Sequence, residues 1–216
     1  VLEPAEPLPP MTQEDLEFER FQIKAVSAIE EELDRILKTR KQSRIQTIAD
    51  MVIRNYGHLD EKINFYQNLR SLEDYVSRHS LNVAILCAMI THVMNIRREE
   101  QYHTVCAALL HDMGKLKKHE DVYFGAPYSR EDAIRNCETQ EEAYSVIEEA
   151  FATEGPAIRR ICQQAAGKQL DLFPEEGKES RYKMLEGSNV LLVANRYDEI
   201  TAMTLQGTAQ SEVKAA

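Results

Sequence analysis

Four side chains that can bind a metal ion lie on predicted helix faces that are otherwise apolar. His79 begins a series of apolar residues spaced four and three apart, and Asp112, the neighbour of His111, ends another. Asp198 lies on the apolar face of a third helix. A buried carboxylate is costly unless something pairs with it, and imidazole nitrogen and carboxylate oxygen bind Zn, Mn, Fe and Ni well. These residues therefore predict one divalent metal site where three helices of a bundle meet.

Three sequence strings around these residues are specific enough to indicate a family. They are RHSLNVA at 78–84, ALLHDMGK at 108–115 and ANRYDEIT at 194–201. The sequence resembles the HD superfamily of metal-dependent phosphohydrolases and, within it, the HD-GYP branch, which hydrolyses cyclic dinucleotides. The resemblance covers roughly residues 60–119 and 186–205. It implies an HD-domain-like helical bundle with extra N-terminal helices.

The sequence also departs from the HD-GYP pattern. HD-GYP enzymes carry a further histidine, an adjacent His pair and a Gly-Tyr-Pro motif. This chain has no histidine after His119, and neither HH nor GYP occurs within 145–187. The resemblance therefore implies a degenerate HD-GYP-like domain that binds one ion of Mn, Fe, Ni, Zn or Mg. The ligands implied for that ion are His79, His111, Asp112 and Asp198.

The same resemblance implies hydrolysis of a phosphate ester at this metal. A bound divalent ion lowers the pKa of a water molecule and polarises a phosphoryl oxygen. Asp112 would orient or deprotonate the water, and Lys115, one turn further on, would neutralise charge on the phosphate. Arg78 and Arg196 are candidates to assist in substrate binding, because arginine matches the geometry of a phosphate group. The expected substrate is a phosphorylated small molecule, either a nucleotide or a cyclic dinucleotide.

Simpler roles remain open for these residues. His79 alone could be a core histidine with a satisfied hydrogen bond, Asp198 could pair with an arginine, and Lys115 could be a surface lysine at a helix end. The polar cluster at 119–121 is either a source of an extra ligand or a solvated loop. At the level of function there are two alternatives to an enzyme. One is a degenerate HD signalling or interaction module that binds a nucleotide or a protein without turnover, and the other is an HD fold with a structural metal.

The composition narrows the class of protein. The chain of 216 residues contains 26 Lys and Arg against 36 Asp and Glu, a net charge of -10, which argues against binding to a nucleic-acid polymer. No apolar run is long enough to span a membrane. Cys87 and Cys106 lie in apolar helical segments and no CxxC pair occurs, so we expect a reducing, cytoplasmic location. With only 8 Gly and 7 Pro, the composition favours an all-α fold over a turn-rich β fold.

Helical periodicity and helix-start residues predict the elements that position the site. We expect no strand, helix starts near 129, 139, 156 and 188, and helices over 12–39, 43–55, 60–69, 71–96 and 99–112. The expected organisation is a flexible proline-rich tail, an N-terminal helical extension, an HD domain and a C-terminal tail, at 1–11, 12–70, 71–206 and 207–216. We also expect the protein either to form a homodimer or to be fused to a sensor domain.

Overall fold

The computed structural model of the chain describes residues 12–60, 69–70, 74–117, 129–168, 183–201 and 203–204. The predicted tails at 1–11 and 207–216 and the polar cluster at 119–121 lie outside these residues. Most of the short helix predicted over 60–69 also lies outside them. None of the helices in the described ranges is both long and apolar enough to cross a membrane.

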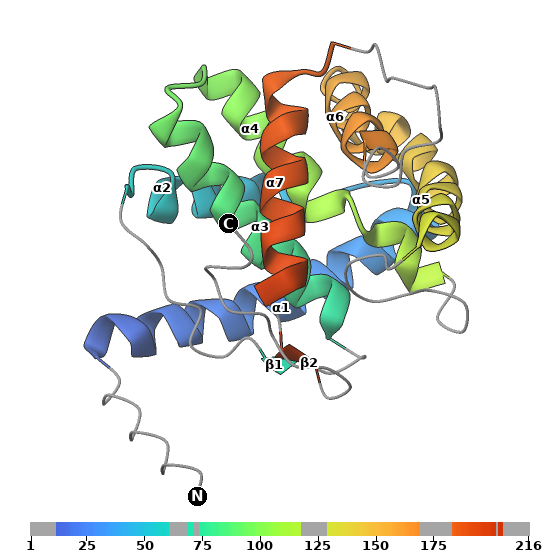
Figure 1. Cartoon of the computed structure of the whole chain (residues 1–216). Helices are drawn as coiled ribbons and strands as arrows, with labels where there is room; N and C mark the ends of the chain where they lie inside the picture. The colour runs from blue at the N-terminus through green and yellow to red at the C-terminus, as the bar shows by residue number, and fades with distance from the viewer. Residues whose placement is uncertain are drawn as a thin grey trace, which may run out of the picture.

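Helices form nearly all of the regular structure among the described residues (Figure 1). They are α1 Gln13–Thr39, α2 Ile45–Tyr56, α3 Tyr75–Val93, α4 Arg98–Leu110, the short 3-10 helix η1 Met113–Lys117, α5 Arg130–Phe151, α6 Gly155–Lys168 and α7 Glu186–Thr201. Two strands of two residues each, β1 Leu69–Arg70 and β2 Met203–Thr204, pair in parallel. The predicted all-α fold is confirmed. The short strand pair was not predicted, because two residues carry no alternating pattern.

Several predicted helix boundaries differ from the structure, and α3 begins at Tyr75 rather than near Ser71. α5 runs without interruption through Thr139, so no helix starts there; Thr139 is buried, and no glycine or proline breaks the segment. α3 ends at Val93 rather than at Ile96. The backbone of Asn95 is left-handed, with a φ of 53°, a conformation that asparagine tolerates and that ends a helix.

α3 lies at the centre of the bundle. It packs against α1, α2, α4 and α7, and thirteen of its nineteen residues are buried (Figure 1). The apolar face predicted from His79 to Val93 is only part of this buried surface. His79 and Val83 are fully buried, whereas Val93 is 65% exposed at the helix end. Because α3 is covered on several sides, its polar residues must find partners inside the protein.

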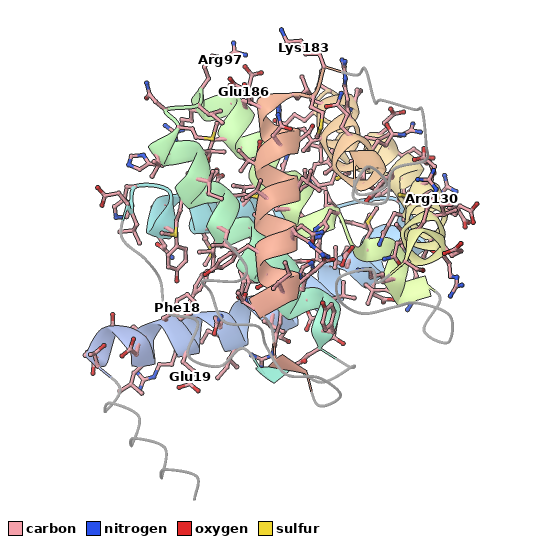
Figure 2. All side chains as sticks on the ribbon, viewed as in Figure 1. Phe18, Glu19, Arg97, Arg130, Lys183 and Glu186 are labelled. Atoms are coloured by element: carbon pink, nitrogen blue, oxygen red, sulfur yellow. The ribbon has the colours of Figure 1, made fainter. Side chains whose placement is uncertain are left out.

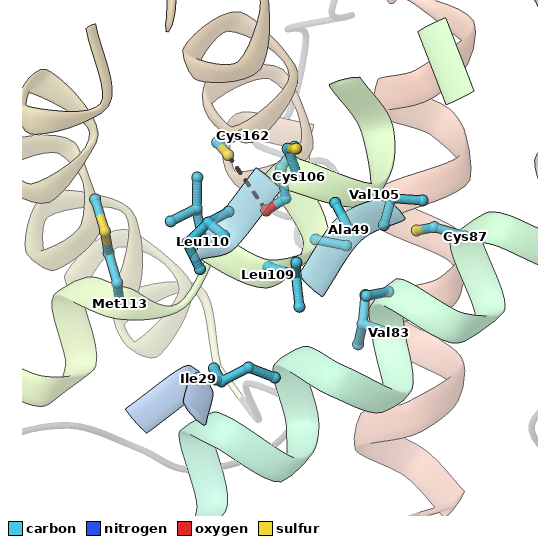
Figure 3. Close-up of a cluster of buried hydrophobic side chains, with 14 of the residues drawn as sticks. Ile29, Ala49, Val83, Cys87, Val105, Cys106, Leu109, Leu110, Met113 and Cys162 are labelled. Atoms are coloured by element: carbon cyan, nitrogen blue, oxygen red, sulfur yellow. Dashed lines mark hydrogen bonds between the residues drawn. The ribbon is translucent and has the colours of Figure 1, made fainter. Parts of the chain in front are cut away.

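Apolar side chains from the N-terminal helices and from the rest of the bundle form one continuous core (Figure 3). Ile29 of α1, Ala49 of α2, Val83 of α3 and Leu109 of α4 all have no exposed surface. Three free cysteines are part of this core, as expected for small apolar side chains. They are Cys87, Cys106 and Cys162.

Most charged side chains lie at the periphery, as Figure 2 shows for Arg97 and Glu186. Glu32 of α1 is an exception, because it is buried against the start of α2. Its carboxylate accepts hydrogen bonds from the backbone N–H groups of Ser43 and Arg44 and from the Ser43 hydroxyl. These groups precede the first turn of α2, where a negative charge also interacts favourably with the helix dipole. Glu32 therefore joins α1 to α2.

Replacing Glu32 with alanine is expected to lower the free energy of unfolding by about 2 kcal/mol, because three buried or partly buried donors lose their acceptor. Urea denaturation measures this loss. The control is Glu31→Ala: Glu31 pairs with Arg44 at the surface and its side chain is 65% exposed. Removal of this exposed pair should cost less than about 1 kcal/mol. Equal losses in the two variants would contradict the capping role.

Candidate metal centre

Three helices bring a cluster of polar side chains into the centre of the fold. α3 contributes His79, and the turn between α4 and η1 contributes His111 and Asp112. α7 contributes Asn195 and Asp198. All five side chains are buried. Ligand atoms of His79, His111 and Asp112 lie within 4.8 Å of one another, so these three predicted residues do converge.

The ring of His79 uses its two nitrogens differently. Nδ1 lies 2.6 Å from Oδ2 of Asp198. A carboxylate accepts hydrogen bonds, so Nδ1 carries a hydrogen, and Nε2 is the ring nitrogen left to bind a metal ion. Nε2 faces the cluster, 3.1 Å from Nε2 of His111. Asp198 therefore lies behind His79 in this structure, where it orients the ring, and not beside the other predicted ligands.

His111 presents its Nε2 in the same way. Its Nδ1 lies 2.8 Å from the carbonyl oxygen of Ala108, which can only accept a hydrogen bond. Tyr144 holds the backbone at this point by donating its hydroxyl hydrogen to the His111 carbonyl at 2.8 Å. Burial lowers the pKa of His111, and the charge of Asp112 only partly opposes this. The ring is therefore neutral near pH 7, with the Nε2 lone pair facing His79.

Asn195 brings an oxygen to the same point. Its Oδ1 lies 2.7 Å from Nε2 of His79 and 3.0 Å from Nε2 of His111. Its Nδ2 donates to Oε1 of Glu199 at 3.3 Å, which fixes the orientation of the amide. Burial raises the pKa of Glu199 to about 7. Asn195 is absent from the predicted residues because an amide is not ionisable. The sequence did contain one signal for Asn195: it stands three residues before Asp198, and this spacing places both residues on one helix face.

Asp112 adds a negative charge to the cluster. Its carboxylate oxygens lie 3.5 Å from Nε2 of His79 and 3.8 Å from Nε2 of His111. Lys115 donates to Oδ2 at 2.5 Å, and Gln140 donates to Oδ1 at 3.2 Å. Burial raises the pKa of Asp112, but the charge of Lys115, joined by the two histidines once they are protonated at low pH, outweighs it and holds that pKa below its ordinary value. Asp112 is therefore ionised at neutral pH.

This set of donors fits a divalent metal ion. The Nε2 atoms of the two imidazoles and an amide oxygen face one another at hydrogen-bond distance, and a carboxylate lies next to them. Facing lone pairs repel one another unless a cation or a proton lies between them. Imidazole nitrogen together with carboxylate and amide oxygen is a ligand set that first-row transition ions accept.

Residues 76–202, more than half of the chain, match the family model of the HD domain, and this segment contains the whole cluster. The chain belongs to the HD-domain family. No curated protein and no solved structure matches the chain. The match to the HD model begins inside α3, and α1 and α2 lie outside it. The domain boundaries placed at 71 and 206 from the sequence stay predictions.

The glycine in the HDMGK string of the HD domain allows α5 to approach the cluster. A Cβ atom at Gly114 would lie 2.6 Å from both Oε1 of Gln140 and the backbone oxygen of Thr139. The Gly114 N–H donates to Oε1 of Gln140 at 2.9 Å, and Nε2 of the same side chain donates to Asp112. Gly114 therefore orients Gln140, which in turn orients the Asp112 carboxylate.

The three predicted substrate-binding side chains of the HD domain lie in different surroundings. Lys115 is 2% exposed and bound to a buried carboxylate, so the alternative of a surface lysine is wrong. Arg78 pairs with Asp74 at 2.5 Å at the start of α3. Nη1 of Arg196 and Oε2 of Glu199 lie 3.7 Å apart, and both atoms are buried without a hydrogen-bond partner. Of the three, Arg196 retains an available buried donor.

A small cavity adjoins the candidate metal ligands of the HD domain. It is lined by His111, Asp112, Lys115 and Asn195 and by side chains of α5 and α6. Its volume is about 20 Å³, room for about one water molecule. Pockets that enclose a drug-sized ligand measure about 300–1,000 Å³. The cavity can therefore hold a water molecule beside Asp112, and a nucleotide that reached this water would lie mainly outside the cavity.

The metal-free HD domain is expected to lose stability as the pH falls below about 6.5, the ordinary pKa of histidine. Because the pKa of His111 is lower in the folded chain, the unfolded chain takes up a proton first, which favours unfolding. His111 alone contributes up to about 1.4 kcal/mol per pH unit to the slope of the free energy of unfolding against pH. Urea denaturation at several pH values measures it. His111→Phe should flatten the slope, and the control His103→Phe, on the preceding helix α4, should not. Equal slopes in both variants would refute this account.

Proposed function

We propose that this HD domain is a metal-dependent phosphohydrolase in which His79, His111 and Asp112 hold one divalent ion, with Asn195 as a further oxygen ligand. The observation that carries the proposal is the 3.1 Å separation of two histidine Nε2 atoms whose rings already donate their Nδ1 hydrogens elsewhere. Asp198, placed among the ligands from the sequence, acts in this proposal through His79 by holding the ring in one orientation.

The proposed ligands favour a transition ion over Mg, because two of the donors are imidazole nitrogens. From the sequence the candidates are Mn, Fe, Ni, Zn and Mg, and the donor set puts Mg last. When bound, such an ion activates a water molecule and polarises a phosphoryl oxygen. Elemental analysis of protein purified without chelator identifies the metal.

Asp112 would orient the attacking water rather than remove its proton. Its pKa lies below the ordinary value, so its carboxylate is a weak base. The oxygens of Asp112 are fixed by Lys115 and Gln140 and lie at the cavity that has room for a water molecule. Lys115 would then place its positive charge where a phosphoryl group approaches that water.

The proposed substrate is a nucleotide or a cyclic dinucleotide. Support comes from the RHSLNVA and ALLHDMGK strings, which resemble the HD-GYP branch. Arg196 would bind a phosphate oxygen of the substrate through its buried, unpartnered Nη1. Arg78, held by Asp74, would contribute less. With the second half of the HD-GYP histidine motif missing, the proposal is for one ion and not for two or three.

A second candidate function is a degenerate HD module that binds a nucleotide or a protein partner without turnover. One observation favours it: a proton on Nε2 of His79 would be donated to Oδ1 of Asn195, 2.7 Å away, and would satisfy the cluster without any ion. In that state the HD domain would bind no divalent metal.

Metal content and turnover, measured on the same preparation, separate these functions. We expect about one transition ion per chain, and hydrolysis of bis-p-nitrophenyl phosphate or of nucleotides that is lost on chelation and restored by Mn, Ni or Fe. One bound ion without any turnover would favour a structural metal. A preparation that binds no Mn, Ni, Fe or Zn would overturn the proposal.

A further inference from the structure

A chain of hydrogen bonds connects α1 with the imidazole of His79. Nε2 of Gln22 donates to Oδ1 of Asn82 at 3.1 Å. Nδ2 of Asn82 donates to Oδ1 of Asp198 at 3.3 Å, and Oδ2 of Asp198 accepts from Nδ1 of His79 at 2.6 Å. All four side chains are buried, so water does not compete freely for these bonds. The chain of bonds begins on a helix that lies outside the segment matched by the HD domain.

The direction of each bond in this chain follows from the carboxylate of Asp198, which can only accept hydrogen bonds. Asn82 therefore presents its nitrogen to α7 and its oxygen to α1, and the Gln22 amide donates to that oxygen. The Asn82 nitrogen then gives the Asp198 carboxylate a donor on Oδ1. If the Asn82 amide turned over, its oxygen would face a carboxylate oxygen, and two acceptors would repel each other. Gln22 therefore stabilises the orientation of Asn82 in which Asp198 holds His79.

We propose that Gln22 is a positioning residue for the metal-binding nitrogen of His79, so that α1 forms part of the support of the metal centre. This inference rests on the proposed metal site. Residues that orient a metal-binding histidine change metal affinity by about 10–100-fold when they are removed. Gln22 lies two hydrogen bonds further from His79 than Asp198 does. We therefore expect its removal to weaken metal binding by a smaller factor, about fivefold.

Gln22→Met removes the donor and keeps an unbranched side chain of similar length. The matched control is Gln101→Met. Gln101 is also 8% exposed and also joins its helix to α3, by donating to the carbonyl of Ala88 and the hydroxyl of Thr91. Thr91 lies about 18 Å along α3 from His79, since each helical residue rises 1.5 Å. Both variants lose a buried interhelical contact, but only one loses the connection to His79.

Two measurements test the proposal: Zn²⁺ affinity by competition with a chromophoric chelator, and the ¹⁵N and ¹H shifts of His79 Nδ1–H in metal-free protein. We expect Gln22→Met to weaken Zn²⁺ binding about fivefold and to shift the Nδ1–H resonance, and Gln101→Met to leave the affinity within about twofold and the resonance unchanged. Thermal melts without metal should show similar destabilisation in both variants.

A second variant, Gln22→Glu, exchanges the donor for an acceptor. Asn82 would then turn its nitrogen towards α1 and its oxygen towards Asp198, so the loss of Zn²⁺ affinity should exceed that of Gln22→Met. Equal Zn²⁺ affinities in the folded Gln22 and Gln101 variants would overturn the positioning role. If the wild-type protein binds no Zn²⁺, the proposed function fails, and the Nδ1–H shift alone decides whether Gln22 positions His79.

Discussion

Asp112→Asn is expected to reduce both metal affinity and turnover by about 10³-fold. The substitution removes one negative charge that faces the two histidine nitrogens at 3.5 and 3.8 Å. At a separation of about 4 Å and the effective dielectric of a protein site, one pair of unit charges contributes about 4 kcal/mol, so the loss of one negative charge next to the proposed cation corresponds to about 10³-fold. Chelator competition measures the affinity, and hydrolysis of a generic phosphodiester measures the turnover.

The same variant should also be less stable, because the buried ammonium of Lys115 loses its partner. Breaking a buried ion pair from one side costs about 3–5 kcal/mol. The double variant Asp112→Asn with Lys115→Met removes both charges and should recover most of this stability while metal binding stays lost. Recovery of stability without recovery of metal binding separates the role of Asp112 at the metal from its role in folding. Turnover that survives Asp112→Asn unchanged would contradict the proposed function.

Asn195→Asp is expected to strengthen divalent metal binding about 100-fold. The amide oxygen of Asn195 lies at the position where α7 meets both histidine nitrogens, so the substitution places a carboxylate there. A new unit negative charge next to a divalent ion strengthens the binding free energy by several kcal/mol. Repulsion from Asp112 offsets part of this gain, so the net gain in binding free energy is about 2.7 kcal/mol, or about 100-fold in affinity. Glu199, whose pKa burial raises to about 7, can remain protonated and donate to the new carboxylate.

Isothermal titration with Mn²⁺ or Zn²⁺ tests this variant. The control is Asn189→Asp, the same substitution at an exposed position of α7, which adds the same net charge away from the cluster. We expect the control to change affinity by less than about threefold, because solvent and salt screen an exposed charge. A weaker binding of metal by Asn195→Asp than by the wild type would show that Asn195 does not face the ion.

The sequence predicts the parts of the site that combine an ionisable side chain with an apolar helix face. His79, His111 and Asp112 satisfy both conditions, and the structure brings their ligand atoms together. Lys115 was predicted near the cluster through its string, but its burial could not be predicted, since lysine is seldom buried without a partner.

Partners across helices could not be predicted, because they depend on how neighbouring helices pack. Gln140 reaches Asp112 only because α5 passes directly over Gly114, and nothing in the local pattern of either segment encodes that approach. Asn195 and Asp198 are three residues apart and share one face of α7, so the sequence alone does not distinguish them. Only the position of α7 against α3 decides which of the two side chains faces the histidine Nε2 atoms.

The way α1 covers the bundle has a practical consequence for making shorter versions of this protein. A fragment that starts at residue 76, where the family match begins, would remove the first residue of α3 together with all of α1 and α2. Ile29 and Leu33 of α1, both without exposed surface, would no longer shield the apolar side chains beneath them. Such a truncated chain would expose apolar surface to water and would aggregate. A shortened version of the protein made for expression should therefore retain the segment from Thr12 onward.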